Sequence, residues 1–331
     1  MKRLKFDERL LKPIFRPASW LRALNPRQRN TKAPMDTSPD APPKPGLNLK
    51  IMSFNIRRGT RRDGRNSWVF RRHLVREVFS RYRPDVLGLQ EALGFQIGEI
   101  HSMLPGYKMS GVQNSGGAKV LHNAIFYNAA RFVLSEQGIF WFSDTPDIPG
   151  SKGWGNIMPR TCSWVRLIDK DSQQPFYFYN VHLDHLSPRS RGKSVVLLMQ
   201  RIHARSYPDD FVLTGDFNAR EKSAPIKYLK GKILLNIKNE GKVSNPDPLR
   251  DTFRMRYPNL RKAATFHGYR RFFFRFKLDY TFVPASIRVI DAKIIQLCLK
   301  KCYPSDHFPL FTLIELPLNI ASPEQDALKN Q

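Results

Sequence analysis

The chain has 331 residues, of which 41% are hydrophobic, and it carries a formal net charge of +27. This length and apolar content allow a large buried core and exclude an intrinsically disordered chain. The positive charge indicates an acidic partner, which can be nucleic acid, a phosphorylated metabolite or an anionic membrane surface, and it does not choose among them.

The first 46 residues are basic and rich in proline, and the stretch APMDTSPDAPPKPG (33–46) has almost nothing to bury. This composition predicts a flexible N-terminal segment over 1–46, a folded domain over 47–318 and a C-terminal tail over 319–331. Residues 1–24 mix Lys and Arg with large apolar residues but lack the uninterrupted apolar core of a signal peptide. We therefore expect an intracellular, cytoplasmic monomer, and peripheral membrane association through 1–24 stays open.

From residue 47 onward, short β-like runs alternate with segments of helical periodicity. The expected strands are, in chain order, 49–56, 84–91, 123–128, 161–168, 176–183, 211–217, 277–284, 289–296 and 309–316. The expected helices are 69–82, a segment through Ile97 to Leu104, and 187–207, which has Ser187 as N-cap and Pro188 at its first position. Many strands with few helices between them suit two stacked sheets covered by helices better than a singly wound parallel sheet.

Polar residues recur where these expected strands end or begin. They are Asn55, Glu91, His182, Asp216, Asn218 and Asp279, followed by Asp306 and His307 just before the last strand. The end of a strand holds a side chain in a fixed position, and several strand ends that converge can place acids, amides and imidazoles around one cleft. Any single residue has a simpler explanation as a turn former, a helix cap or a core histidine, so the prediction rests on the ordered set.

These residue types suit one class of reaction. Carboxylates and amides without a thiolate cluster offer hard oxygen ligands, which favour Mg²⁺ or Mn²⁺ over zinc. Such an ion can clamp a phosphate oxygen and activate a water, while an Asp-oriented histidine handles protons and amide donors hold other phosphate oxygens. The combination predicts phosphoester hydrolysis.

Six motifs in a fixed order resemble the endonuclease/exonuclease/phosphatase superfamily over residues 49–316. They are SFNIR (53–57), LGLQEAL (87–93), NVHLDH (180–185), LTGDFNA (213–219), LDYTFV (278–283) and SDHFPL (305–310). PGSKGWGNIMPRTCSWVRL (149–167) and TFHGY (265–269) are similar to a bacterial-type branch without an assigned substrate. The resemblance implies a DNase I-like α/β fold, a four-layer α/β/β/α sandwich with two packed mixed β-sheets. It also implies a Mg²⁺-dependent phosphodiesterase or phosphatase domain over 47–318.

The resemblance also implies roles for the matched residues at the metal and at the phosphate. Asn55 and Glu91 match metal-shell positions, with Glu91 as the principal ligand, and Asp306 lies near the metal. Asp216 matches the carboxylate that positions or deprotonates the attacking water, and Asn218 matches the amide that holds the phosphate. Both can project from one strand end because side chains alternate along an extended backbone.

The remaining matched residues concern proton transfer and substrate contact. His182 matches a histidine that contacts a phosphate oxygen or helps to protonate the leaving group. Asp279 matches the acid that orients His307, and His307 either donates to the phosphate or acts as the base. Arg57 would face the phosphate bidentately if its side chain turns inward, and His267 is a candidate for lining the substrate pocket.

Two basic stretches bear on the substrate, because loops set selectivity in such a superfamily. Residues 57–83 contain ten arginines against two acids, and residues 250–277 contain nine Lys/Arg against one acid. The second stretch includes HGYRRFFFRFK (267–277), and aromatics beside cations suit stacked bases on a tracked backbone, which makes a nuclease the leading interpretation. The same stretch could insert at an anionic bilayer, which would indicate a phospholipid or sphingolipid phosphodiesterase. A sugar or inositol phosphatase is a further alternative. The aromatic residues could also simply pack in a strand, with every second one facing the core. A basic binding protein on an inactive hydrolase scaffold is disfavoured, because no catalytic-type position is replaced.

Overall fold

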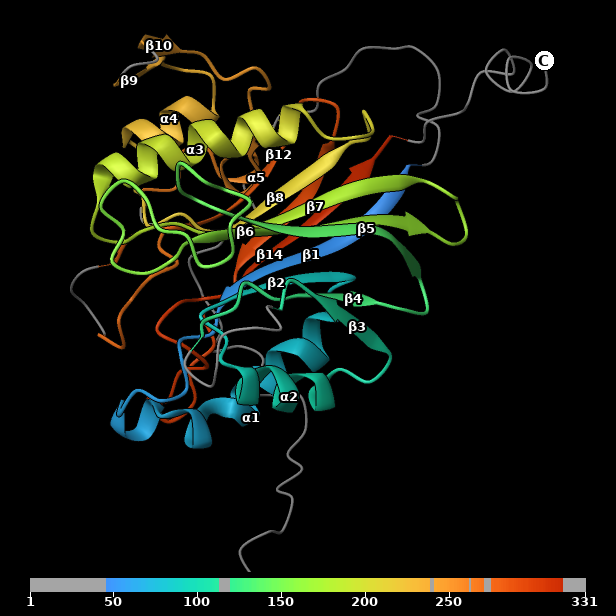
Figure 1. Cartoon of the computed structure of the whole chain (residues 1–331). Helices are drawn as coiled ribbons and strands as arrows, with labels where there is room; N and C mark the ends of the chain where they lie inside the picture. Colours follow the sequence, from blue (N-terminus) through green and yellow to red (C-terminus); the bar gives the residue numbers. More distant parts are fainter. Residues whose placement is uncertain (1–45, 113–119, 239–240, 262, 271–274, 318–331) are drawn as a thin grey trace, which may run out of the picture. The chain divides into compact units, whose positions relative to one another are not determined.

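Two six-stranded β-sheets stack face to face at the centre of the fold, with helices on both outer faces (Figure 1). The computed structural model describes residues 46–112, 120–238, 241–261, 263–270 and 275–317, which all belong to one unit of the chain, residues 40–331. Of the expected tails, 1–46 and 319–331, only residue 46 is described, and part of the aromatic stretch, 271–274, also lies outside the described residues.

The first sheet contains the N-terminal and C-terminal strands of the domain side by side. Its order is β13 (Arg288–Ile294), β14 (Leu310–Leu316), β1 (Leu47–Asn55), β2 (Val86–Gln90), β4 (Ile125–Asn128) and β3 (Tyr107–Ser110). Strands β1 and β2 are parallel and the other pairs are antiparallel. Every residue of β2 is buried, as expected for a strand that is covered on both faces.

The second sheet has the same mixed character. Its order is β11 (Arg250–Asp251), β12 (Asp279–Val283), β8 (Phe211–Asp216), β7 (Pro175–His182), β6 (Thr161–Asp169) and β5 (Phe132–Trp141). Strands β7 and β8 are parallel, and the other pairs are antiparallel. A separate two-stranded sheet pairs β9 (Leu235–Ile237) with β10 (Gly241–Val243).

Helices cover the outer faces and complete four layers. Helices α1 (Trp68–Tyr82) and α2 (Gly94–Met103) pack on the first sheet, and α3 (Pro188–His203) and α4 (Ala224–Leu229) pack on the second. The short elements are a 3₁₀ turn (Gly64–Asn66) and α5 (Thr252–Arg256). The predicted four-layer α/β/β/α sandwich is confirmed.

Strand alternation sorts the apolar residues into separate layers of core. Leu49 and Ile51 of β1 pack between the sheets against residues such as Phe178 of β7, whereas Met52 and Phe54 face the helices of the first outer layer. Because successive side chains of a strand point to opposite faces, one strand serves two cores. The sheets are also joined by a polar contact, since the buried Asn180 donates to the Leu89 carbonyl oxygen at 2.9 Å.

Helix α3 begins as predicted. The Ser187 hydroxyl accepts the backbone N–H of Ser190 at 3.0 Å, and Pro188 occupies the first turn. The helix ends at His203, earlier than the expected 207. Within the described ranges, the structure contains no helix long and apolar enough to cross a membrane.

The arginine-rich stretch 57–83 is partly structural. Arg71 of α1 is 1% exposed, and its guanidinium donates to the backbone carbonyls of Asn66, Pro304 and Arg57 at 2.7–2.9 Å. These three bonds tie α1 to two loops that surround the strand ends. Arg71 therefore supports the fold and has no free edge for a nucleic acid.

Replacing Arg71 with methionine is expected to lower the free energy of unfolding by about 3 kcal/mol, because three buried carbonyl oxygens lose their donor. The exposed Arg76 of the same helix provides the matched control, and Arg76→Met is expected to stay within about 0.5 kcal/mol of wild type. Chemical denaturation of both variants measures the difference. Unchanged stability of Arg71→Met would contradict the structural role.

Candidate active site

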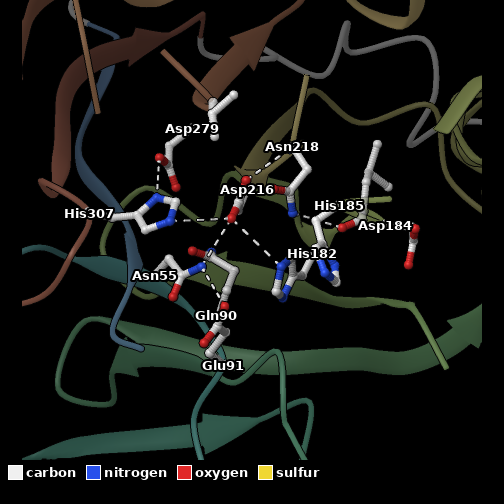
Figure 2. Close-up of polar contacts among 12 residues, drawn as sticks. Asn55, Gln90, Glu91, His182, Asp184, His185, Asp216, Asn218, Asp279 and His307 are labelled. Atoms are coloured by element: carbon white, nitrogen blue, oxygen red, sulfur yellow. Dashed lines mark hydrogen bonds and ion pairs between the residues drawn. The ribbon is translucent and has the colours of Figure 1, made fainter. Parts of the chain in front are cut away.

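The pairing register of the strands explains which side chains meet at one edge of the sandwich. Asn55 lies opposite Gln90 at the end of the parallel pair β1–β2, and His182 lies opposite Asp216 at the end of β7–β8. Antiparallel β12 starts at the same place, with Asp279 opposite Asp216. All five side chains point to the same face of their strands as the apolar residues that pack between the two sheets. They therefore converge at the edge where this core ends (Figure 2).

Asp216 is the centre of this group and is 1% exposed. Its Oδ2 accepts a hydrogen bond from Asn55 Nδ2 at 3.0 Å and lies 3.6 Å from His182 Nε2 and 3.8 Å from His307 Nε2. Burial, followed by the nearby Asp279 carboxylate, raises the pKa of Asp216 to about 7. This carboxyl group can therefore gain and lose a proton near neutral pH, as a general base must.

The glycine before Asp216 is required by close packing of the backbone. Gly215 has a φ of +144°, and a Cβ atom at this position would lie 2.1 Å from the Val181 carbonyl oxygen. Only glycine fits there. After β8 the chain turns sharply at Asn218, which has a φ of 47°, and the backbone N–H of Asn218 donates to Asp216 Oδ1 at 2.9 Å. Asn218 Nδ2 also donates to the Leu183 carbonyl, which leaves its second amide hydrogen for a ligand.

His307 and Asp279 form a buried pair. His307 Nδ1 lies 2.8 Å from Asp279 Oδ2, which leaves Nε2 directed toward Asp216. Burial alone would lower the pKa of His307, but the Asp279 and Asp216 carboxylates outweigh it and raise the pKa to about 10. His307 is therefore a cation at neutral pH. Ser305 anchors this segment by donating to the Asn55 carbonyl at 2.7 Å.

Arg160 is a functional candidate for which the sequence interpretation gave no role. Its buried guanidinium contacts both ring nitrogens of His182 at 3.2–3.3 Å, His185 Nδ1 at 2.9 Å and Asp184 Oδ2 at 3.3 Å. Burial, then Arg160 and His307, hold the pKa of His182 well below its usual value. His182 is therefore neutral beside a cationic His307. The only sequence signal for Arg160 was its place in the motif 149–167.

Glu91 projects from the chain directly after β2. It has a φ of 60°, which is uncommon for a residue with a side chain. Glu91 Oε1 accepts from Asn55 Nδ2 at 3.3 Å, and Oε2 accepts from the Arg58 backbone N–H at 3.2 Å. Asn55 thus bridges the carboxylates of Glu91 and Asp216.

Arg57 and Asp306 are held by each other. Arg57 Nη1 binds Asp306 Oδ2 at 2.6 Å, while its Nε and Nη2 bind Asp63 at 2.7 and 2.8 Å. Burial raises the pKa of the buried Asp306, although His307 and Arg57 oppose this effect. Because carboxylates already occupy the guanidinium, a bidentate contact from Arg57 to a phosphate stays a prediction, as does the place of Asp306 near a metal.

His267 packs behind the site rather than lining an open surface. Its fully buried ring stacks on Phe308 with centroids 4.2 Å apart and lies 4.5 Å from the Tyr303 ring. Its backbone N–H donates to the Asp306 carbonyl at 2.9 Å, so it supports the segment that carries His307. A substrate cannot contact this ring in the present conformation, and direct binding by His267 stays a prediction.

Comparison with known proteins identifies the family. The model of the endonuclease/exonuclease/phosphatase family matches residues 52–307. The chain belongs to this family. It is 30% identical over 190 residues to an uncharacterized protein of Acanthamoeba polyphaga mimivirus, a match that covers 53% of this chain and 68% of the viral protein. The predicted resemblance is confirmed, and members of the family are phosphoester hydrolases.

Solved structures of this family match most of the chain. An endonuclease/exonuclease/phosphatase from Bacteroides vulgatus has a TM-score of 0.71 and 25% identity, covering 82% of this chain and 99% of that chain. A mannosyl-6-phosphatase from Bacteroides thetaiotaomicron has a TM-score of 0.69 and 28% identity, covering 80% of this chain and 99% of that chain. Both share the four-layer architecture.

Members of the endonuclease/exonuclease/phosphatase family generally use a divalent metal, and two groups of side chains here are candidates. Ligand atoms of Asp216, Asp279 and His307 lie within 4.8 Å of one another. However, His307 is bonded to Asp279 and is cationic, which opposes a metal there. Glu91 fits better, because its carboxylate oxygens are hard donors and the carboxylate is half-buried with only long hydrogen bonds. Asn55 can add only the second lone pair of its Oδ1, which already accepts the Arg57 backbone N–H at 3.0 Å, because its Nδ2 faces Glu91.

Proposed function

We propose that the protein is a Mg²⁺-dependent phosphoester hydrolase that acts on nucleic acid phosphodiesters by direct attack of water. The observation that carries the chemistry is the buried array of Asp216, Asp279 and His307. It combines a carboxylate that titrates near pH 7 with a histidine that stays cationic. Such a pair suits a reaction in which one group takes a proton while another stabilises negative charge on phosphate.

The proposed roles follow from these charges. Asp216 accepts a proton from water as the water oxygen bonds to phosphorus. The bond from phosphorus to the leaving oxygen breaks, its electron pair goes to the leaving oxygen, and that oxygen takes a proton from solvent. His307 donates from Nε2 to a phosphate oxygen, while Asp279 holds its other nitrogen. The free amide hydrogen of Asn218 binds a second phosphate oxygen, and neutral His182 contacts the phosphate on the side of Arg160.

Glu91 and Asn55 would hold the metal, and Arg57 would fix the neighbouring Asp306 in place. When bound, Mg²⁺ or Mn²⁺ supplies positive charge to the phosphate oxygens and lowers the pKa of a bound water. The oxygen-only donor set supports this choice over a metal that prefers thiolates.

Nucleic acid is the favoured substrate because the net charge of +27 suits a polyanion. A second candidate, hydrolysis of a sugar phosphate, is favoured by the 28% identity to a mannosyl-6-phosphatase. Lipid phosphodiesters share the same reacting group and belong in the same substrate panel.

The test is hydrolysis by the purified full chain of 5′-labelled single- and double-stranded DNA and RNA, mannose 6-phosphate, sphingomyelin vesicles and bis-p-nitrophenyl phosphate. Each reaction is run with Mg²⁺, with EDTA and with the Asp216→Asn variant. Fragments of polynucleotide that disappear in both controls are expected. If only mannose 6-phosphate or only the lipid is hydrolysed, nucleic acid is not the substrate and that compound's class replaces it. Activity that survives EDTA and Asp216→Asn would overturn the mechanism.

A further inference from the structure

A recess of about 920 Å³ opens beside the active site, between the start of α3, the segment after β8 and strand β9. Asn218 and His185 line it, and both also belong to the active-site cluster (Figure 2). The Lys and Arg residues that line it are Arg189, Arg191, Lys193, Arg220 and Lys238, and none of its lining residues is acidic. We refer to this recess as the basic groove.

The charges of the basic groove are largely unneutralised. In the part of the chain that the structure describes, the exposed Arg189, Arg220 and Lys238 form no ion pair, and the Arg220 guanidinium lies 3.6 Å from the centroid of the Phe276 ring. Lys193 lies 3.6 Å from Asp144, whose side chain is 75% exposed, and such surface pairs contribute little. Arg191 donates to the Asp184 carbonyl at 2.8 Å and keeps its charge. The groove therefore presents a positive surface that leads away from the catalytic residues.

The floor of the basic groove is apolar. We call its apolar lining residues, Leu235, Ile237, Pro225 and Leu278, the floor of the groove; the first three are buried residues of the domain. Gly192 lines it from within α3, and a Cβ atom built there would meet no atom within 4 Å. Basic and apolar residues that line one recess match a ligand that alternates phosphates with flat apolar groups.

We propose that the basic groove binds a single strand of nucleic acid beside the scissile phosphate, with its phosphates on the Lys and Arg residues and its unpaired bases on the apolar floor. This inference rests on the proposed function. A duplex turns its bases inward and cannot use such a floor, and a membrane is bound by protruding apolar side chains rather than by a recess. A phosphorylated monosaccharide would leave most of the 920 Å³ unused.

Charge removal tests the walls of the groove. The double variant Arg189→Gln with Lys238→Gln removes two charges, and Arg76→Gln with Lys108→Gln removes two exposed charges from α1 and β3. Binding of a fluorescein-labelled single-stranded oligonucleotide is measured by anisotropy in an Asp216→Asn background, so that no turnover interferes. We expect the slope of log K against log salt to fall by about 1.4 in the groove variant, about 0.7 for each lost phosphate contact, and to stay unchanged in the control.

Adding a side chain at Gly192 provides a second test, which leaves the charge of the groove unchanged. Gly192→Leu places a side chain in the groove without altering charge, and Gly98→Leu is a matched control because Gly98 is also helical, in α2, with open space at its Cβ. Leucine stabilises a helix relative to glycine, so neither variant should unfold. Gly192→Leu is expected to weaken oligonucleotide binding about tenfold, and Gly98→Leu to leave it unchanged.

The outcomes separate this inference from the proposed function. If the wild-type protein hydrolyses bis-p-nitrophenyl phosphate but the groove variants bind oligonucleotide as their controls do, the groove proposal is wrong and the reaction stands. If no phosphoester is hydrolysed but the groove variants still lose oligonucleotide binding, the proposed function is wrong and the groove is supported. Stronger binding of duplex than of single strand would overturn the choice of ligand.

Discussion

Asp216→Asn is expected to lower the rate of phosphoester hydrolysis about 10³-fold or more, because the amide cannot accept a proton from water. The substitution preserves the shape of the side chain. Its single carbonyl oxygen can keep only one of two bonds, the one that Asn55 donates to Oδ2 or the one that the Asn218 backbone donates to Oδ1. The raised pKa of Asp216 means that burial disfavours the charged form, so above pH 7 the neutral amide should not reduce stability.

The same shift predicts the acid limb of the wild-type pH profile. Activity should rise as pH increases through about 7, where Asp216 loses its proton. The measurement is kcat/KM for bis-p-nitrophenyl phosphate between pH 5 and pH 9, with the exposed Asp171→Asn as a control of unchanged activity. Near wild-type turnover by Asp216→Asn would remove this residue from the mechanism.

Asp279→Asn is expected to reduce kcat by up to about 10⁴-fold, the scale found when a carboxylate that holds a catalytic histidine becomes an amide. The Nδ1–H of His307 loses its charged acceptor, and one cause of its raised pKa is removed. In the wild type, His307 is protonated below about pH 10, so activity should fall only as pH rises through that value. In Asp279→Asn the alkaline fall should begin at lower pH.

A surface pair offers the matched control for this prediction. Asp247 lies 3.0 Å from the Nδ1 of His203, and the His203 side chain is 63% exposed, so Asp247→Asn removes a carboxylate from a histidine without affecting catalysis. Comparison of the pH profiles of kcat for Asp279→Asn and Asp247→Asn, measured beyond pH 10, distinguishes a positioning role from a general loss of charge. An alkaline limb that does not move in Asp279→Asn would show that His307 is not the titrating cation.

The buried strands of the sandwich could be predicted because their residues are apolar on both faces. The edge strand β5 could not, since Gly138 and the polar residues before it interrupt the pattern. The structure explains the glycine, because a Cβ atom there would lie 2.7 Å from the Trp164 ring. This constraint comes from a residue 26 positions away in the sequence, across the β5–β6 pair, and no local rule reveals it.

The convergence of Asn55, His182, Asp216 and Asp279 could be predicted from strand ends and alternation. The partners of long cationic side chains could not. Arg57 binds Asp306, which is 249 residues away, and Arg160, the residue before β6, contacts His182. Composition likewise favoured residues 57–83 and 250–277 for substrate binding, whereas the basic groove is formed mainly by α3, the segment after β8 and β9. The contacts of a long side chain depend on which distant segments the fold brings near it, and a local sequence pattern does not contain this information.

Arg57, Glu91 and Asn218 share a backbone feature, since each lies just beyond a strand end with a φ of 47–60°. Such a conformation costs a residue with a side chain on the order of 1 kcal/mol or more, and glycine would relieve it. Glycine would also remove the carboxylate, guanidinium or amide that the turn carries. Directed evolution for heat resistance alone would therefore favour glycine at these turns and erode catalysis, so a screen for durable variants needs a simultaneous selection for turnover.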